Sequence, residues 1–71
     1  MAVKPRLKPE IRYYQTKKVS DYFTGADPGI SKTAFVRALN GRVCEPWTMH
    51  RIFNLLEVPP DRREGLIEWV R

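Results

Sequence analysis

GISKTAFVRALNGR, residues 29–42, contains a helix start signal and a helix stop signal around one apolar face. Ser31 is a suitable N-cap, because its hydroxyl can accept a hydrogen bond from a backbone N–H that is unpaired at a helix start. Asn40 and Gly41 both tolerate the left-handed conformation in which many helices end. The apolar residues between these signals recur at helical spacing: Ala34, Phe35, Ala38 and Leu39. The segment therefore predicts a helix over residues 31–39.

The opposite face of this predicted helix carries groups that bind polar partners. It holds Lys32, Thr33, Val36, Arg37 and Asn40. Lys and Arg can donate hydrogen bonds to guanine, and Thr offers base edges a hydroxyl and a methyl group. Taken alone, such a face is also typical of an ordinary solvated helix surface. The composition of the rest of the chain has to decide between the two interpretations.

Positive charge is concentrated in the same part of the chain. The 71 residues carry a net charge of +5. Residues 1–42 hold nine Lys and Arg against three Asp and Glu, whereas residues 43–71 hold four against five. Clustered cations attract the phosphate backbone of nucleic acids. The coincidence of this charge with the polar helix face favours DNA binding over a merely solvated surface.

Composition argues against several other classes of protein. The single cysteine, Cys44, cannot form an internal disulfide, and with the single histidine, His50, it provides no zinc ligand set. No apolar run approaches the ~20 residues that span a membrane, and no signal-peptide pattern is present. There is no Ser/His/Asp order and no glycine-rich phosphate loop. We expect a cytoplasmic protein that is not an enzyme and needs no cofactor, membrane or small-molecule substrate.

Residues 1–9, MAVKPRLKP, alternate basic residues with prolines and show no apolar periodicity. This pattern predicts a flexible basic N-terminal arm outside the folded domain. The cations of the arm are Lys4, Arg6 and Lys8. Such an arm can follow phosphates or enter the minor groove of DNA, and a tail without a function is the equal alternative.

Further helices are predicted on both sides of residues 29–42. Residues 10–18 suit either a strand or a short helix, of which we favour the helix, and residues 17–24 predict another short helix. GADPG at 25–29 predicts a loop. Pro46 suits a first helical position, and the helix it begins ends at Val58-Pro59-Pro60. The apolar residues of that helix recur at i, i+3, i+4 and i+7: Met49, Ile52, Phe53 and Leu56. A last helix is predicted after the prolines, with an apolar side made of Leu66, Ile67, Trp69 and Val70.

These elements predict an all-α fold, a small bundle of four to five helices in a single domain over residues 10–71. Its predicted core is Phe35, Leu39, Ile52, Phe53 and Leu56. Trp69 and Val70 could close this core or form the seam of a dimer, and the sequence leaves both open. A chain of this length buries only about 60% of its unfolded surface, so a dimer would add stability.

Residues 29–56 resemble the lambda-repressor-like, Cro/XRE-type helix-turn-helix DNA-binding domain. The resemblance lies in Gly-Ile-Ser-Lys-Thr at 29–33, Asn-Gly-Arg at 40–42 and Pro-Trp-Thr-Met at 46–49, together with Arg37. It implies that the helix over residues 31–39 is a recognition helix. The chain departs from the family pattern before that helix, because Thr-Gly-Ala-Asp-Pro at 24–28 enlarges the usual turn.

The resemblance implies roles for the matching residues. Lys32 and Thr33, at the start of the recognition helix, would read base edges in the major groove, and so would Arg37 one turn later. Contacts to DNA phosphates are predicted for Ser31, Asn40, Arg42, Lys17 and Lys18. The N-terminus of the helix adds its own attraction for phosphate.

The function predicted from these observations is sequence-specific binding of double-stranded DNA by a transcriptional regulator. The chain would be a repressor of phage, plasmid or bacterial type, associated with the nucleoid when it is bound to DNA. It would act as a homodimer on a pseudo-palindrome whose half-sites lie about 10 base pairs apart. The alternative is a small helical interaction module that binds an acidic partner protein. Single-stranded nucleic acid, stacked on tyrosines, is a third and weaker alternative.

Overall fold

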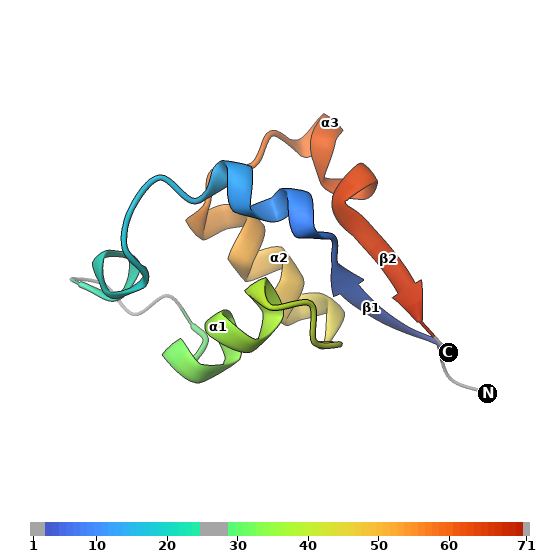
Figure 1. Ribbon diagram of the computed structural model, residues 1–71, viewed down its shortest axis with the longest axis horizontal. Helices are drawn as coiled ribbons and strands as arrows, with labels where there is room; N and C mark the ends of the chain where they lie inside the picture. Colours follow the sequence, from blue (N-terminus) through green and yellow to red (C-terminus); the bar gives the residue numbers. More distant parts are fainter. Residues whose placement is uncertain (1–2, 25–28, 71) are drawn as a thin grey trace.

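The computed structural model describes residues 3–24 and 29–70. The elements follow in the order β1 (Lys4–Leu7), η1 (Pro9–Tyr14), η2 (Val19–Phe23), α1 (Lys32–Leu39), α2 (Pro46–Leu55), α3 (Pro60–Arg63), η3 (Glu64–Leu66) and β2 (Ile67–Val70), where η marks a 3-10 helix. The two strands form a small sheet at one end of the elongated molecule, and η2 lies at the other end (Figure 1). Helices α1 and α2 lie between these two ends.

The expectation of an all-α bundle is wrong, because the two ends of the chain form a two-stranded antiparallel sheet. Its register pairs Lys4 with Val70, Pro5 with Trp69, Arg6 with Glu68 and Leu7 with Ile67. The single last helix expected after the prolines is instead two short helical turns, α3 and η3, followed by strand β2, which begins at Ile67. Apolar residues at positions 66, 67, 69 and 70 suit either structure, and β-branched and aromatic side chains favour a strand once a partner strand is available.

Part of the segment expected to be a flexible arm is strand β1. Pro5 and Leu7 are buried in it, whereas Met1 and Ala2 lie outside the described residues. The backbone oxygen of Pro5 accepts a hydrogen bond from the Cys44 N–H at 3.0 Å, so β1 is held on the side away from β2 as well. Proline has no backbone N–H to donate. Pro5 suits this position, because its backbone groups lie on the edge of β1 that does not pair with β2.

The polar face of the sheet carries one ion pair. Arg6 Nη2 donates to Glu68 Oε1 at 2.9 Å, across the strands. The hydrogen bond from Arg6 lowers the pKa of the Glu68 carboxyl, and the same bond raises the pKa of Arg6. Both side chains are partly exposed to solvent, so we expect this pair to add little to the free energy of unfolding.

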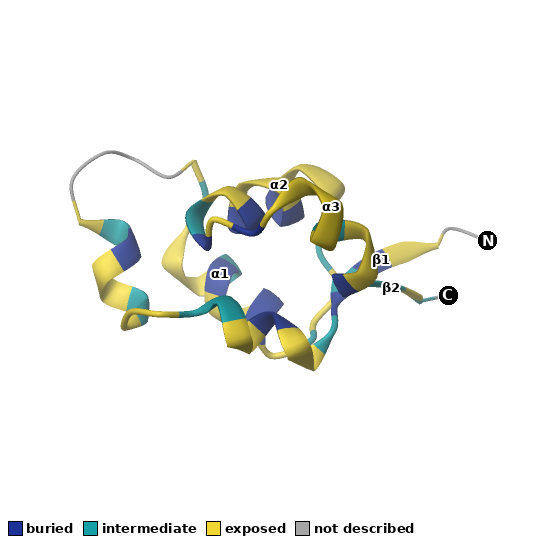
Figure 2. Cartoon of the chain, turned by 90° about the horizontal axis from the view of Figure 1, so that it is seen from above, coloured by how far each residue is buried: buried dark blue, intermediate teal, exposed yellow. Residues whose placement is uncertain are grey.

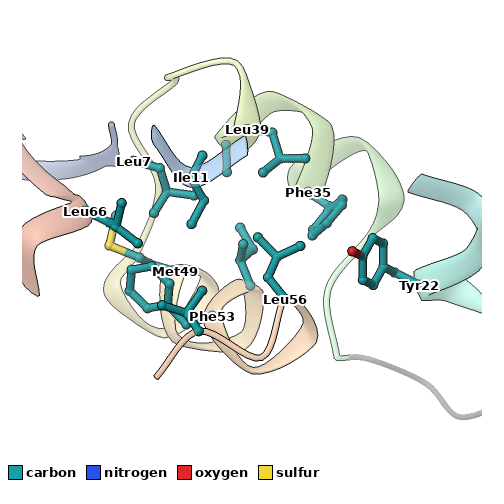
Figure 3. Close-up of a cluster of buried hydrophobic side chains, with 12 residues drawn as sticks. Leu7, Ile11, Tyr22, Phe35, Leu39, Met49, Phe53, Leu56 and Leu66 are labelled. Carbon is teal, nitrogen blue, oxygen red and sulfur yellow. The ribbon is translucent and has the colours of Figure 1, made fainter. Parts of the chain in front are cut away.

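The core lies between α1, α2 and the sheet, where their apolar faces meet (Figures 2 and 3). All five core residues expected from the sequence are buried: Phe35, Leu39, Ile52, Phe53 and Leu56. Leu7 of β1 and Ile11 of η1 complete the centre and are at most 2% exposed. At the far side, the rings of Tyr22 and Phe23 pack on Phe35, with centroids 5.6 and 5.4 Å away. Through these rings η2 fixes α1 from the side opposite the sheet.

The helix expected over residues 31–39 is confirmed as α1, and both of its end signals work as expected. Ser31 Oγ accepts a hydrogen bond from the Ala34 N–H at 3.0 Å. At the other end Gly41 adopts the left-handed conformation, with φ 89°. Its N–H donates to Ala38 O at 3.0 Å, and the Arg42 N–H donates to Arg37 O at 3.1 Å. These two bonds are the Schellman motif, which ends the helix and places Arg42 beside Arg37.

Replacement of Gly41 by alanine tests this helix end. A side chain at Gly41 would meet no other atom within 4 Å, so any cost comes from the left-handed backbone alone. We expect Gly41→Ala to lower the free energy of unfolding by about 1–2 kcal/mol in urea titrations. Gly65→Ala is the matched control, because Gly65 also has open space around it and no left-handed φ. Equal losses in the two variants would contradict the assignment.

Candidate nucleic-acid interface

The face of α1 that points away from the core is exposed to solvent. It displays Lys32, Thr33, Val36, Arg37 and Asn40, while Phe35, Ala38 and Leu39 on the other side are buried. No acidic residue stands in the first turn of the helix. Since a helical turn takes 3.6 residues, Thr33 and Arg37 lie one above the other on this face. The polar stripe expected from the sequence is therefore available to a partner.

An open hollow of about 730 Å³ runs along this face of α1. On one side it is lined by Ser31, Thr33, Arg37 and Asn40 of the α1 segment. On the other side it is lined by the connection from Arg42 to Glu45, by the start of α2 at Thr48, and by Lys4 of β1. The tertiary structure thus places a cation from the predicted arm beside the predicted recognition helix.

The other predicted site residues lie outside the hollow. Lys32 is exposed on the first turn of α1 and does not line it. Lys17 and Lys18 precede η2, where the Lys17 ammonium lies 5.3 Å from the centroid of the Tyr22 ring. Arg6 is paired with Glu68, and Lys8 is the residue before η1. The predicted residues therefore fall into a group along α1 and a group of cations elsewhere on the surface.

Arg12 contacts the C-terminal end of this face of α1, a neighbour that no sequence pattern indicated. It lies on η1, and its Nη2 donates to Asn40 Oδ1 at 2.6 Å, at the C-terminal end of α1. Arginine has only donors, so the oxygen of the Asn40 amide faces Arg12 and the NH₂ group is left to donate elsewhere. A cation at this end of the helix also complements its dipole. The two residues are 28 positions apart, and no local pattern links them.

The electrostatic character of the hollow is positive with one exception. Lys4, Arg37 and Arg42 line it, and Glu45, the N-cap residue of α2, is its acidic side chain. Cys44 also lines the hollow, and burial, followed by the nearby Glu45 carboxylate, raises the pKa of its thiol. The thiol therefore stays protonated and poorly nucleophilic at neutral pH. The chemistry available here is the binding of anions by donors and cations.

No match to a known protein was found. The comparisons covered protein-family models, curated proteins and solved structures. Within residues 3–24 and 29–70, no helix is long and apolar enough to cross a membrane. The same residues contain no cluster of three or more His, Cys, Asp or Glu side chains that could hold a metal ion. The case for a function therefore rests on the geometry of this chain.

The contact between Arg12 and Asn40 can be tested without any ligand. We expect Arg12→Met to move the NMR signals of the Asn40 side-chain amide, because the hydrogen bond to its oxygen is lost. The loss of stability should stay below about 1 kcal/mol, since both side chains are exposed. The amide of Asn54 is the internal control, because its oxygen accepts from Arg63 instead, at 3.1 Å. An unchanged Asn40 amide signal would show that the two side chains do not pair.

Proposed function

We propose that the chain binds double-stranded DNA with sequence preference, and that it acts as a transcriptional regulator. The exposed face of α1 enters the major groove in this proposal. One observation carries it: the donors of α1 and the cations Lys4 and Arg42 gather around one open hollow along that helix. A groove-reading helix needs both kinds of group, because side chains at base edges give specificity and cations near phosphates give affinity.

Base edges are read from the exposed stripe of α1. Thr33 and Arg37 lie on adjacent turns of one face, and Lys32 stands beside them in the first turn. An arginine can bind guanine O6 and N7 with two hydrogen bonds, and a threonine methyl can contact thymine. Val36 on the same stripe is 37% exposed and adds an apolar surface for a thymine methyl group.

The hollow beside α1 receives the sugar–phosphate strand that borders the groove. Arg42, Lys4 and the free NH₂ group of Asn40 supply donors on its two sides. At the start of α1 the Ser31 hydroxyl accepts a hydrogen bond from the Ala34 N–H. The preceding N–H groups of the first turn are then available to donate to a phosphate oxygen. The resemblance of residues 29–56 to the Cro/XRE-type domain supports these two roles, base contacts from α1 and phosphate contacts around the hollow.

Selection of bound sequences from a pool of random DNA duplexes tests the proposal. We expect binding to all duplexes at low salt, with an affinity that falls steeply as salt is raised, and enrichment of a short motif. Absence of any complex at low salt would overturn the proposal and leave the acidic partner protein as the function to test. Binding without enrichment would overturn the sequence preference alone.

Replacement of Arg37 by alanine tests the role of α1. We expect Arg37→Ala to weaken binding to the selected motif by about 1–3 kcal/mol and to relax the preference at one base pair. Fluorescence anisotropy on labelled duplexes measures both effects. Arg62→Ala is the matched control, because Arg62 is an exposed arginine on α3 and does not line the hollow. An unchanged affinity for Arg37→Ala would exclude α1 as the reading helix.

Replacement of Glu45 tests where the phosphates lie. A carboxylate that faces a phosphate repels it, so Glu45→Gln should strengthen binding to every duplex by about 0.5–1 kcal/mol at low salt. Glu64→Gln removes the same charge from η3, outside the hollow, and should change the affinity less. Equal effects of the two substitutions would mean that only net charge matters and that no phosphate occupies the hollow.

A further inference from the structure

An arginine of α2 covers the point where the chain enters α1. Gly29 lies two residues before the N-cap Ser31 and adopts the left-handed conformation, with φ 83°. A Cβ atom on Gly29 would lie 2.7 Å from Cζ and 3.1 Å from Cδ of Arg51. The guanidinium and the adjoining part of the Arg51 stem therefore occupy the space that a side chain at Gly29 would fill.

Charge does not account for this position of Arg51. Within the described residues the one ion pair joins Arg6 to Glu68, so no carboxylate there holds Arg51. A cation near the N-terminus of a helix is also unfavourable, because the helix dipole is positive at that end. What remains is the contact with the backbone of Gly29, which a planar guanidinium can approach closely because glycine has no side chain.

Arg51 lies on the side of α2 that faces the start of α1. It stands three residues after Thr48, so the two share one face of α2, about a turn apart. Thr48 is buried and lines the hollow together with Ser31. Ile30, which follows the covered glycine, packs on the core. The entry to α1 is therefore held against the core by Ile30 and tied to α2 by Arg51.

We propose that Arg51 is a positioning residue for DNA reading. By covering Gly29 it sets the angle between the start of α1 and α2, and so the direction of Lys32 and Thr33. Arg51 does not contact DNA in this proposal and acts through the backbone of Gly29. The inference rests on the proposed DNA-binding function, because the angle of α1 matters only to a partner that its exposed face reads.

The geometry of α1 makes its first turn sensitive to this contact. Its C-terminal end is tied by the backbone hydrogen bond from Gly41 to Ala38 O. The connection that follows is tied to β1, since the Cys44 N–H donates to Pro5 O. The eight residues of α1 span about 12 Å, so a tilt of ~10–20° about the C-terminal end moves the first turn by about 2–4 Å. Binding groups have to be placed to within about 0.5 Å, so such a tilt breaks the base contacts of the first turn.

Residual dipolar couplings of backbone N–H groups measure the angle between α1 and α2 without DNA. We expect Arg51→Met to change the couplings of α1 relative to those of α2, because the guanidinium over Gly29 is lost. Arg51→Lys should have the same effect, since a compact, hydrated ammonium does not replace a planar guanidinium. Arg62→Met is the matched control, because Arg62 is an exposed arginine on α3. Unchanged couplings in both Arg51 variants would overturn the inference.

Fluorescence anisotropy with the selected motif and with random duplexes separates positioning from a direct phosphate contact. We expect both Arg51 variants to bind the motif about fivefold more weakly or worse, because base contacts of the first turn are lost. Their affinity for random duplexes should stay within about twofold, with an unchanged dependence on salt. If Arg51→Met weakens binding to both duplexes equally and lowers the salt dependence, while Arg51→Lys binds like the wild type, Arg51 contacts phosphate and the inference is wrong.

The two measurements together distinguish this inference from the proposed function. Changed couplings with an unchanged affinity for the motif also overturn the inference, since the angle of α1 then has no effect on reading. A wild-type chain that binds no DNA, with couplings that change in the Arg51 variants, contradicts only the proposed function. If circular dichroism shows that Arg51→Met is unfolded, Arg51→Lys alone decides.

Discussion

The pairing of β1 with β2 is the contact on which the rest of the structure depends. It joins residues 62 positions apart, at the Arg6–Glu68 ion pair, and so closes the chain on itself. A chain of 71 residues can bury only a small core, and this closure brings Leu7 and Leu66 to the helices that need covering. The hydrogen bond from the Cys44 N–H to Pro5 O then ties the connection between α1 and α2 to the same sheet.

The position of α1 depends on this pairing of the two strands. Its apolar face is held from two sides, by the sheet and α2 and by the aromatic rings of η2 around Phe35. A helix of eight residues is too short to be stable alone, so these contacts and its two end motifs keep it folded. Because the buried side is fixed, the side with Thr33 and Arg37 is presented to solvent in one orientation, as a groove-reading helix requires.

The small sheet also contributes residues to two surfaces of different chemical character. On the α1 side it contributes Lys4 to a hollow rich in donors and cations. On the α2 side it contributes Ile67 and Trp69 to an apolar groove. Cations line the first surface, whereas apolar side chains make up most of the second. The two surfaces therefore offer different chemistry to a partner.

The sequence by itself determined the elements whose signals are local. The Ser31 cap, the Gly41 end and the apolar spacing of residues 49–56 specify α1, α2 and their buried faces, because helical hydrogen bonds join residues only four apart. It did not determine β2, since the apolar pattern of residues 66–70 suits helix and strand equally and β1, some 60 residues away, decides. The same holds for the candidate site. Its polar stripe on α1 could be predicted from the sequence, but only the tertiary structure brings Lys4 to the hollow and Arg12 to Asn40.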